Sequence, residues 1–449
     1  FFTPRTIVEF MVRMVEPKEG EIICDPASGS GGFLIRFFDI VRQQILADAD
    51  RLYQSYEPTS ADLGQPRRKT PLTELERAEL LRKRYDEIQQ TIDQRKSGSR
   101  IWKLSNLCVY GTDANDRMAR TSKMNMILHG DGHGGVHHHN GFVNVNGVFE
   151  ERFDVILTNP PFGANVEPSD VLTEDQSTVH PDADRRYRHE YGDVYKQAQA
   201  RVEAGKGKPI ASLFELPKRG GDGAKLGKVK TEILFIERCL ALLKPGGRLG
   251  IVLPEGIFNN PSLAYVREFC EDRARILAVV SLPQETFYSS GASVKASLLF
   301  LGKFTEKEHA DYDKKQAAAR KEIDDKYADE IARRTELLEG EIQSAKQKKD
   351  YESVKTTQRE LRVYLAEMAE RKTREARALL KERYAYPIFL YEAEKVGITA
   401  TGEPDANELY PNDRLPAGIT PEDTCLEVYR RFRKNPKAFL LAANGGGDA

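Results

Sequence analysis

The 449-residue chain exceeds the usual size of a single domain, so we expect one large core with insertions and at least one further module. It carries 68 Lys and Arg against 69 Asp and Glu, which excludes a globally basic nucleic-acid binder and leaves only a local DNA surface. The five cysteines lack paired or metal-ligand spacing and no apolar run reaches the roughly 20 residues of a membrane span, so we expect a cytoplasmic protein with reduced thiols and no membrane partner.

Short apolar runs, several of them bounded by turn residues, predict buried strands along the first two thirds of the chain. They are residues 21–24, 107–112, 153–158, 248–253, 276–281 and 296–301. Helical patterns at residues 6–15, 116–128, 231–243 and 262–273 alternate with these strands. Residues 244–247, Lys-Pro-Gly-Gly, predict a helix stop and a turn before the next strand. The alternation predicts an α/β fold with a doubly wound sheet.

Two polar stretches interrupt this alternation, at about residues 48–100 and 163–227. The first is predicted to be helical around residues 72–92. The second is rich in Gly, Pro, Asp and Lys and follows the candidate catalytic motif directly. Loops of this length are usually functional or disordered, so both a mobile substrate-closing loop and plain disorder fit the second stretch.

Residues 311–384 differ in composition and are dominated by Ala, Glu, Lys, Arg and Gln. Apolar residues at helical spacing predict an antiparallel, coiled-coil-like pair, with the bend near Gly340 and residues 343–350. The pair is either a solvated structural arm or a docking arm for a partner, with a stripe from Ile323 to Leu379 as the docking surface. We therefore expect a catalytic domain at 1–310, a charged helical arm at 311–384 and a C-terminal segment at 385–449. Because the chain starts with Phe1, we expect that its N-terminus is trimmed.

A glycine-rich loop follows the first predicted strand. Residues 25–33, Asp-Pro-Ala-Ser-Gly-Ser-Gly-Gly-Phe, lead into a helix, and their small side chains let the backbone approach a ligand at the helix N-terminus. The loop favours a nucleotide-like cofactor that has a carboxylate, and the alternative is an ordinary glycine turn. Asp113 ends the second predicted strand, where it either accepts the hydroxyls of a ribose or caps the helix that follows Asn115.

The tetrapeptide Asn159-Pro160-Pro161-Phe162 closes the third predicted strand. The Asn159 side-chain oxygen and the Pro160 carbonyl can each accept one N–H of an aromatic amine, which makes the nitrogen lone pair more available. The prolines fix the backbone, and Phe162 offers a stacking face for a base taken out of its duplex. A strand-ending turn is the alternative, but the position after a strand and downstream of the glycine loop favours catalysis.

Together with Phe1–Arg5, Met124–Gly130 and Leu242–Pro254, these motifs resemble the modification subunit of type I restriction-modification systems. The resemblance covers about residues 1–301 and resumes around 387–413. It implies an S-adenosylmethionine-dependent adenine-N6 DNA methyltransferase with a Rossmann-like sheet and an antiparallel seventh strand. It also implies double-stranded DNA as substrate, a separate specificity subunit as partner, and a restriction or translocase subunit as a further candidate partner.

By this resemblance, the first residues line the methionine end of the cofactor, the glycine loop holds its amino-acid portion and Asp113 holds the ribose. Asn140 stands where many relatives have an acid after the third strand, and Asp131 is an alternative. The candidate cofactor-binding residues are Phe1, Thr3, Pro4, Asp25, Ala27, Gly29, Gly31, Gly32, Asp113 and Asn140. The candidate catalytic residues are Asn159, Pro160, Pro161 and Phe162.

Several features depart from the family pattern or leave alternatives open. The two polar stretches and the segment from Asp311 exceed that pattern, and the helical domain that normally precedes the first motif is not in this chain. A histidine cluster is predicted to be a polar loop rather than a Zn or Ni site; its members are His129, His133, His137, His138 and His139. Methylation of RNA or of a protein glutamine, or a non-catalytic scaffold, are the competing functions. Phe rather than Tyr at 162 favours DNA, and an intact Asn159 argues against a scaffold.

Overall fold

The computed structural model describes residues 2–130, 134–177, 179–219, 227–291 and 293–439. The chain divides into two compact units: Phe1–Lys303 together with Ile388–Ala449, and Phe304–Pro387. Within the described ranges, none of the helices combines the length and apolar character needed to cross a membrane.

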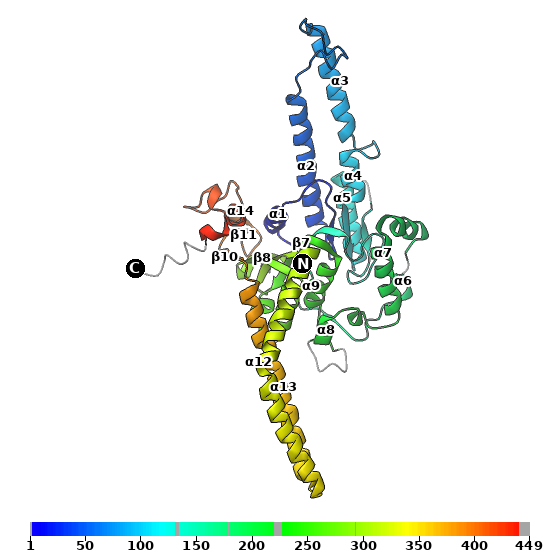
Figure 1. Ribbon diagram of the computed structural model, residues 1–449. Helices are drawn as coiled ribbons and strands as arrows, with labels where there is room; N and C mark the ends of the chain where they lie inside the picture. Colours follow the sequence, from blue (N-terminus) through cyan, green and yellow to red (C-terminus); the bar gives the residue numbers. More distant parts are fainter. Residues whose placement is uncertain (1, 131–133, 178, 220–226, 292, 440–449) are drawn as a thin grey trace. The chain divides into compact units, whose positions relative to one another are not determined.

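An eight-stranded sheet forms the centre of the larger unit, with the order β10-β8-β9-β7-β4-β1-β2-β3 (Figure 1). All neighbouring pairs are parallel except those of β9, which runs antiparallel to β7 and β8. The Rossmann-like sheet and its antiparallel strand are confirmed. The strands are β1 Ile23–Asp25, β2 Val109–Asp113, β3 Val136–His138, β4 Phe153–Thr158, β7 Leu243–Pro254, β8 Ala274–Ser281, β9 Ala296–Lys303 and β10 Phe389–Glu392.

Helices cover both faces of this sheet, so its central strands are apolar on both sides. In β4, Val155 and Leu157 belong to one buried cluster and Ile156 to the other, as expected for side chains that alternate between the faces of a strand. The first cluster includes residues of α1 and α2, and the second includes residues of α9 and α11. The helices are α1 Arg5–Met14, α2 Gly32–Gln54, α4 Arg100–Leu107, α5 Asp116–Leu128, α9 Thr231–Leu242, α10 Gly256–Asn259 and α11 Ala264–Glu271; η2 Pro261–Leu263 and η3 Gln284–Ser290 are 3-10 turns.

Two local predictions are wrong. The predicted helix stop is confirmed, since α9 ends at Leu242, but the turn expected at residues 244–247 is an irregular part of β7. Phe153 pairs with Leu243 while Val155 pairs with Arg248. The histidine-containing stretch expected to be a polar loop includes the strand β3, which pairs with β2 at the edge of the sheet.

The described part of the stretch at 163–227 contains helices and short strands, so plain disorder is wrong there. The alternative of a substrate-closing segment stays a prediction. Helix α7 of this stretch carries Tyr187, Tyr191 and Tyr195 at helical spacing, and all three rings contact Phe149. The buried guanidinium of Arg152 lies 5.3 Å from the ring centroids of Tyr187 and Tyr191, so both rings are favourable cation–π partners. The elements are β5 Asn165–Val166, α6 Glu174–Ser177, α7 Pro181–Gly205, η1 Ile210–Leu213, α8 Leu216–Arg219 and β6 Val229–Lys230.

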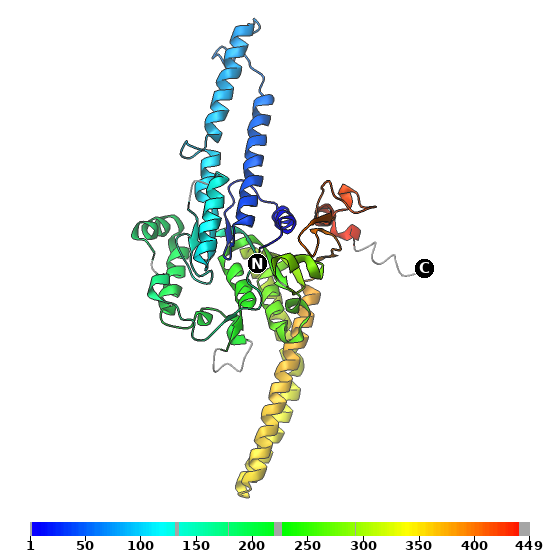
Figure 2. The ribbon, with the colours of Figure 1, turned by 180° about the vertical axis from the view of Figure 1, so that it is seen from behind.

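The helix predicted in the other polar stretch is confirmed as α3, Glu74–Ile92. It begins with a capping box between Thr73 and Glu76, and Arg68 donates two hydrogen bonds to the Glu76 carboxylate. Figures 1 and 2 show α3 beside the outer half of α2, and together they extend beyond the sheet.

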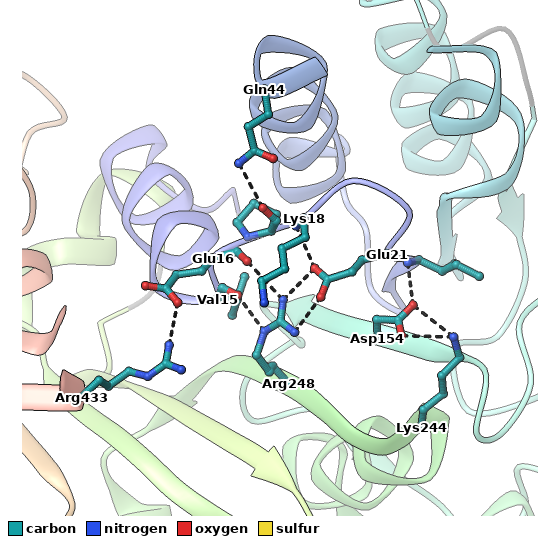
Figure 3. A network of polar contacts seen from close by, with 11 residues as sticks. Val15, Glu16, Lys18, Glu21, Gln44, Asp154, Lys244, Arg248 and Arg433 are labelled. Carbon is teal, nitrogen blue, oxygen red and sulfur yellow. Dashed lines mark hydrogen bonds and ion pairs between the residues drawn. The ribbon is translucent and has the colours of Figure 1, made fainter. Parts of the chain in front are cut away.

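A polar network joins the end of α1 to the edge at which the parallel strands begin (Figure 3). Arg248 of β7 donates to the Val15 carbonyl at 2.7 Å and to both oxygens of Glu21 at 2.9 and 2.8 Å. Asp154 of β4 accepts the Ile22 backbone N–H at 2.9 Å. These bonds fix the start of β1 beside β4. They therefore help to position the glycine loop that follows the end of β1.

The smaller unit is a pair of long helices, α12 Glu306–Gln347 and α13 Tyr351–Arg383, as predicted. Gly340 lies inside α12, and the bend falls at residues 348–350, within the predicted polar stretch 343–350. Ile323, Tyr327 and Met368 are buried in one cluster within the pair. The apolar stripe predicted to dock a partner is therefore largely buried between the two helices.

Residues from Ile388 onward complete the larger unit. β10 pairs with β8 in parallel, and α14, Cys425–Lys434, packs its Tyr429 and Phe432 rings against Phe389. The remaining elements are β11 Val396–Ile398, β12 Pro404–Asn407 and η4 Pro421–Asp423.

Candidate active site

The candidate residues come together because four parallel strands end at the same edge of the sheet. Asp25 is the last residue of β1 and Asp113 the last residue of β2, while Asn140 and Asn159 follow β3 and β4. β1 lies between β2 and β4, so the strand order reverses at this position. In open α/β sheets, ligands bind in the crevice at such a reversal.

The glycine loop has the conformation that its sequence requires. Gly29 and Gly31 have φ values of 53° and 86°, in the left-handed region, and Gly31 is the N-cap of α2. The Gly31 N–H donates to the Ser28 carbonyl at 2.7 Å, and the Asn125 side chain donates to the Ser30 carbonyl at 3.0 Å. Gly32 is the first residue of α2. The loop therefore presents a helix N-terminus at the carboxyl end of β1.

Two carboxylates flank this loop. Burial raises the pKa of Asp25 to about 7, and the nearby Asp113 carboxylate adds to the increase; the Ala27 N–H opposes it by donating to Asp25 at 3.0 Å. Asp113 accepts the Gly29 N–H at 2.9 Å, while Asn115 and not Asp113 is the N-cap of α5. The two acids create a site that favours a cationic group, because a positive charge would stabilise the ionised form of Asp25.

Buried hydroxyls beside the loop are available to a ligand. Ser28 and Ser122 each have a buried Oγ that finds no hydrogen-bond partner in the described part of the chain. A Cβ placed on Gly31 would lie 2.6 Å from Ser122 Oγ. Buried polar groups without a hydrogen bond cost free energy. A polar ligand bound beside the loop could supply the missing hydrogen bonds of these two hydroxyls.

Asn140 lies next to the same loop. Its Oδ1 accepts the Phe142 N–H at 3.0 Å, and a Cβ on the following Gly141 would overlap the Pro26 carbonyl. Phe1, Asp131 and His133 fall outside the described residues. Among the residues that are described, no three His, Cys, Asp or Glu side chains group in a way that could hold a metal ion.

Asn159 is held from the N-terminal segment. Its Nδ2 donates to Thr3 Oγ1 at 3.0 Å, so Thr3 contacts the candidate catalytic motif, and Pro4 is buried at the start of α1. This orientation leaves Asn159 Oδ1 to accept a hydrogen bond from another group.

Phe162 is half-buried and has an aromatic neighbour that the sequence did not indicate. The Phe287 ring of η3 lies edge-on to it, with 6.3 Å between the ring centroids. The same turn reaches the N-terminal segment, since Ser290 Oγ donates to the Phe2 carbonyl at 2.6 Å. No spacing motif marks Phe287, because η3 follows β8, which β9 and β7 separate from β4 in the sheet, and only the folded chain brings the two rings together.

A family model described as N-6 DNA Methylase matches residues 1–72, 88–197 and 221–372, well over half of the chain. The chain belongs to this family. The N-6 DNA methylase match skips residues 73–87 and 198–220, which lie inside the two polar stretches of the sequence. It also continues to residue 372 in α13, so most of the charged helical segment lies within the matched range.

Similar proteins include methylase subunits of type I restriction enzymes. The EcoEI subunit of Escherichia coli is 28% identical over 263 residues, which are 58% of this chain and 39% of that protein. The StySPI subunit of Salmonella potsdam is 21% identical over 308 residues, 68% of this chain and 40% of that protein. A modification subunit of a putative type I restriction enzyme from Vibrio vulnificus has a solved structure with 20% identity and a TM-score of 0.39, covering 68% of this chain and 44% of that one. The chain thus spans about two fifths of the length of the curated relatives it matches.

Proposed function

We propose that this protein transfers a methyl group from S-adenosylmethionine to the N6 amine of adenine in double-stranded DNA, within a restriction-modification or related phage-defence system. The observation that carries the proposal is the bond from Asn159 Nδ2 to Thr3. This bond orients the Asn159 amide so that Oδ1 can accept a hydrogen bond at the sheet edge where the glycine loop lies. Membership of the N-6 DNA methylase family supports the choice of adenine.

The cofactor fits the residues at the ends of β1, β2 and β3. Asp25 would accept the ammonium group of the methionine portion, and binding of that cation would lower the raised pKa of its carboxyl. Gly29, Gly31 and the N-terminus of α2 would receive the carboxylate, and Asp113 the ribose hydroxyls. When bound, S-adenosylmethionine supplies a methyl group already activated by its sulfonium sulfur.

The chain's own residues prepare the amine. Asn159 Oδ1 and the Pro160 carbonyl each accept a hydrogen bond from one N–H of the amine. The nitrogen then becomes more tetrahedral, and its lone pair can attack the methyl group. Phe162 stacks against the flipped base, and Phe287 supports the Phe162 ring from its edge. The methylated amine is cationic after the transfer and releases a proton to water, so no residue has to act as a base beforehand.

Sequencing for N6-methyladenine in host DNA, with and without this protein, tests the proposal. We expect methylated adenine at one recurrent sequence only when the protein is present. A parallel assay of methyl transfer to RNA and to protein glutamine distinguishes the substrates. Transfer to either of these without methylated adenine in DNA would contradict the proposal.

We further expect the single chain to methylate defined duplexes poorly and to need a separate specificity subunit. Base flipping costs a few kcal/mol, and sequence recognition requires groove contacts in addition. The net charge of −1 gives little general attraction to DNA. The measurement is the methylation rate on one duplex with and without candidate partner subunits, and sequence-specific methylation by the isolated chain would reject partner dependence.

The helical arm is the proposed docking element, through its outer faces rather than its buried stripe. Tyr351 and Leu337 are 75% and 51% exposed there. The arm can be replaced by a short Gly-Ser linker, because Lys303 pairs with Ala274 and Phe389 with Ala278, two residues of the same strand β8 that are four positions apart. Deletion of residues 311–383 should remove the partner's stimulation and preserve cofactor binding. Full activity of the shortened protein in the complex would reject the docking role.

A further inference from the structure

The backbone after Asn159 depends on a distant segment for its hydrogen bonds. Pro160 and Pro161 have no N–H, and residues 159–164 lie outside any helix or strand. The Pro161 carbonyl accepts a hydrogen bond from Thr231 Oγ1 at 2.7 Å. The Ala164 carbonyl accepts the Thr231 backbone N–H at 3.1 Å. One residue of α9 thus holds the loop at two positions.

The neighbours of Thr231 hold the residue between these two positions. Lys230 Nζ donates to the Gly163 carbonyl at 3.1 Å, and the Gly163 N–H donates to Glu232 Oε2 at 3.3 Å. Three consecutive residues at the junction of β6 and α9 therefore form hydrogen bonds with three of the four residues from Pro161 to Ala164. The short β5–β6 pair, in which Asn165 opposes Lys230, continues this connection.

These contacts come from the interior of the larger unit. Thr231 and Glu232 are 7% and 6% exposed, and the helix that follows them is buried along its length. A buried hydroxyl or carboxylate costs free energy unless it is hydrogen-bonded, and here the partners are backbone groups of the loop. A loop held by a packed helix is positioned more accurately than one held by its own residues.

We propose that Thr231 and Glu232 are positioning residues that fix the Asn159–Phe162 loop for methyl transfer; this inference rests on the proposed function. They act through the backbone of residues 161–164, which sets where Phe162 and the Pro160 carbonyl stand relative to the target amine. A displacement of about 1 Å in a reacting geometry can cost roughly a hundredfold in rate. Loss of these bonds should therefore lower kcat and leave the glycine loop, and with it cofactor affinity, unchanged.

The test compares Thr231→Val, Thr231→Ser and Glu232→Gln with wild type in the full protein together with its specificity partner. For Thr231→Val we expect kcat to fall roughly tenfold to a hundredfold, with an unchanged KM for S-adenosylmethionine. Thr231→Ser keeps the hydroxyl and should restore most of kcat. Glu232→Gln keeps an acceptor for Gly163 and should lose less than Thr231→Val. Hydrogen exchange should be faster in Thr231→Val at the Gly163 amide, which donates to Glu232, and at the amide of residue 231, which donates to the Ala164 carbonyl.

Thr424→Val is the matched control, because Thr424 is also fully buried and its Oγ1 donates to a proline carbonyl, Pro421, at 2.8 Å. It should lose similar stability and keep wild-type kcat. Equal losses of kcat in Thr231→Val and Thr424→Val would overturn the inference. A kcat of Thr231→Val equal to that of an active wild type would also overturn it. Wild type that methylates no adenine rejects the proposed function itself, and the inference with it.

Discussion

Asn159→Ala is expected to retain S-adenosylmethionine affinity and to lose adenine methylation by roughly a hundredfold or more. The alanine removes the Oδ1 that would accept the amine N–H, whereas the glycine loop, Asp25 and Asp113 stay in place. Because the lost bond is strongest in the transition state, the effect should fall on kcat. Single-turnover methylation on a cognate duplex, with calorimetry for the cofactor, measures the two quantities separately.

Asn106→Ala provides the comparison for this variant. Asn106 is also partly buried and its Nδ2 donates to a single acceptor, the Trp102 carbonyl, at 2.8 Å within α4. This change should leave methylation as it is. Retained activity of Asn159→Ala on DNA would contradict the catalytic role of Asn159.

Gly31→Val is expected to abolish S-adenosylmethionine binding in a protein that still folds. Gly31 has a φ of 86°, and its Cβ would lie 2.6 Å from Ser122 Oγ. A branched residue must therefore move the loop, and the N-terminus of α2 moves with it. Calorimetric titration of the cofactor measures the effect, and circular dichroism checks the fold.

Gly20→Val separates backbone strain from loss of the site. Gly20 has the same φ of 86°, but no atom lies within 4 Å of its Cβ position. Both variants should lose roughly 1–3 kcal/mol of stability from strain, and only Gly31→Val should lose the cofactor. Wild-type affinity in folded Gly31→Val would reject the assignment of the glycine loop.

The local elements of the candidate site could be predicted because their signals are short-range. A glycine that needs positive φ, an apolar run of strand length and a proline pair are all visible within a few residues. The predicted strand at residues 153–158 and the predicted helix at 116–128 agree with β4 and α5. The strand irregularity at residues 244–247 was missed because the same Pro-Gly-Gly composition suits a turn and an irregular strand, and pairing with β4 decides between them.

The folded state of the 163–227 stretch could have been inferred in part. Tyr187, Tyr191 and Tyr195 recur every four residues, which is a helical signal within a polar background. What they bury is not local, since Arg152 and Phe149 come from the chain before the catalytic motif. The Gly and Pro content of the stretch therefore suggested a disorder that its described part does not have.

The sequence by itself determined which chemistry-bearing residues follow each strand, and that parallel strands bring the glycine loop, Asp113 and Asn159 to one edge. Only the tertiary structure decided how these residues are held. The bonds of Asn159 to Thr3 and of Pro161 to Thr231 join positions 156 and 70 residues apart. Such contacts depend on strand order and helix packing, because local periodicity specifies which face of an element is buried but not which distant residue it meets.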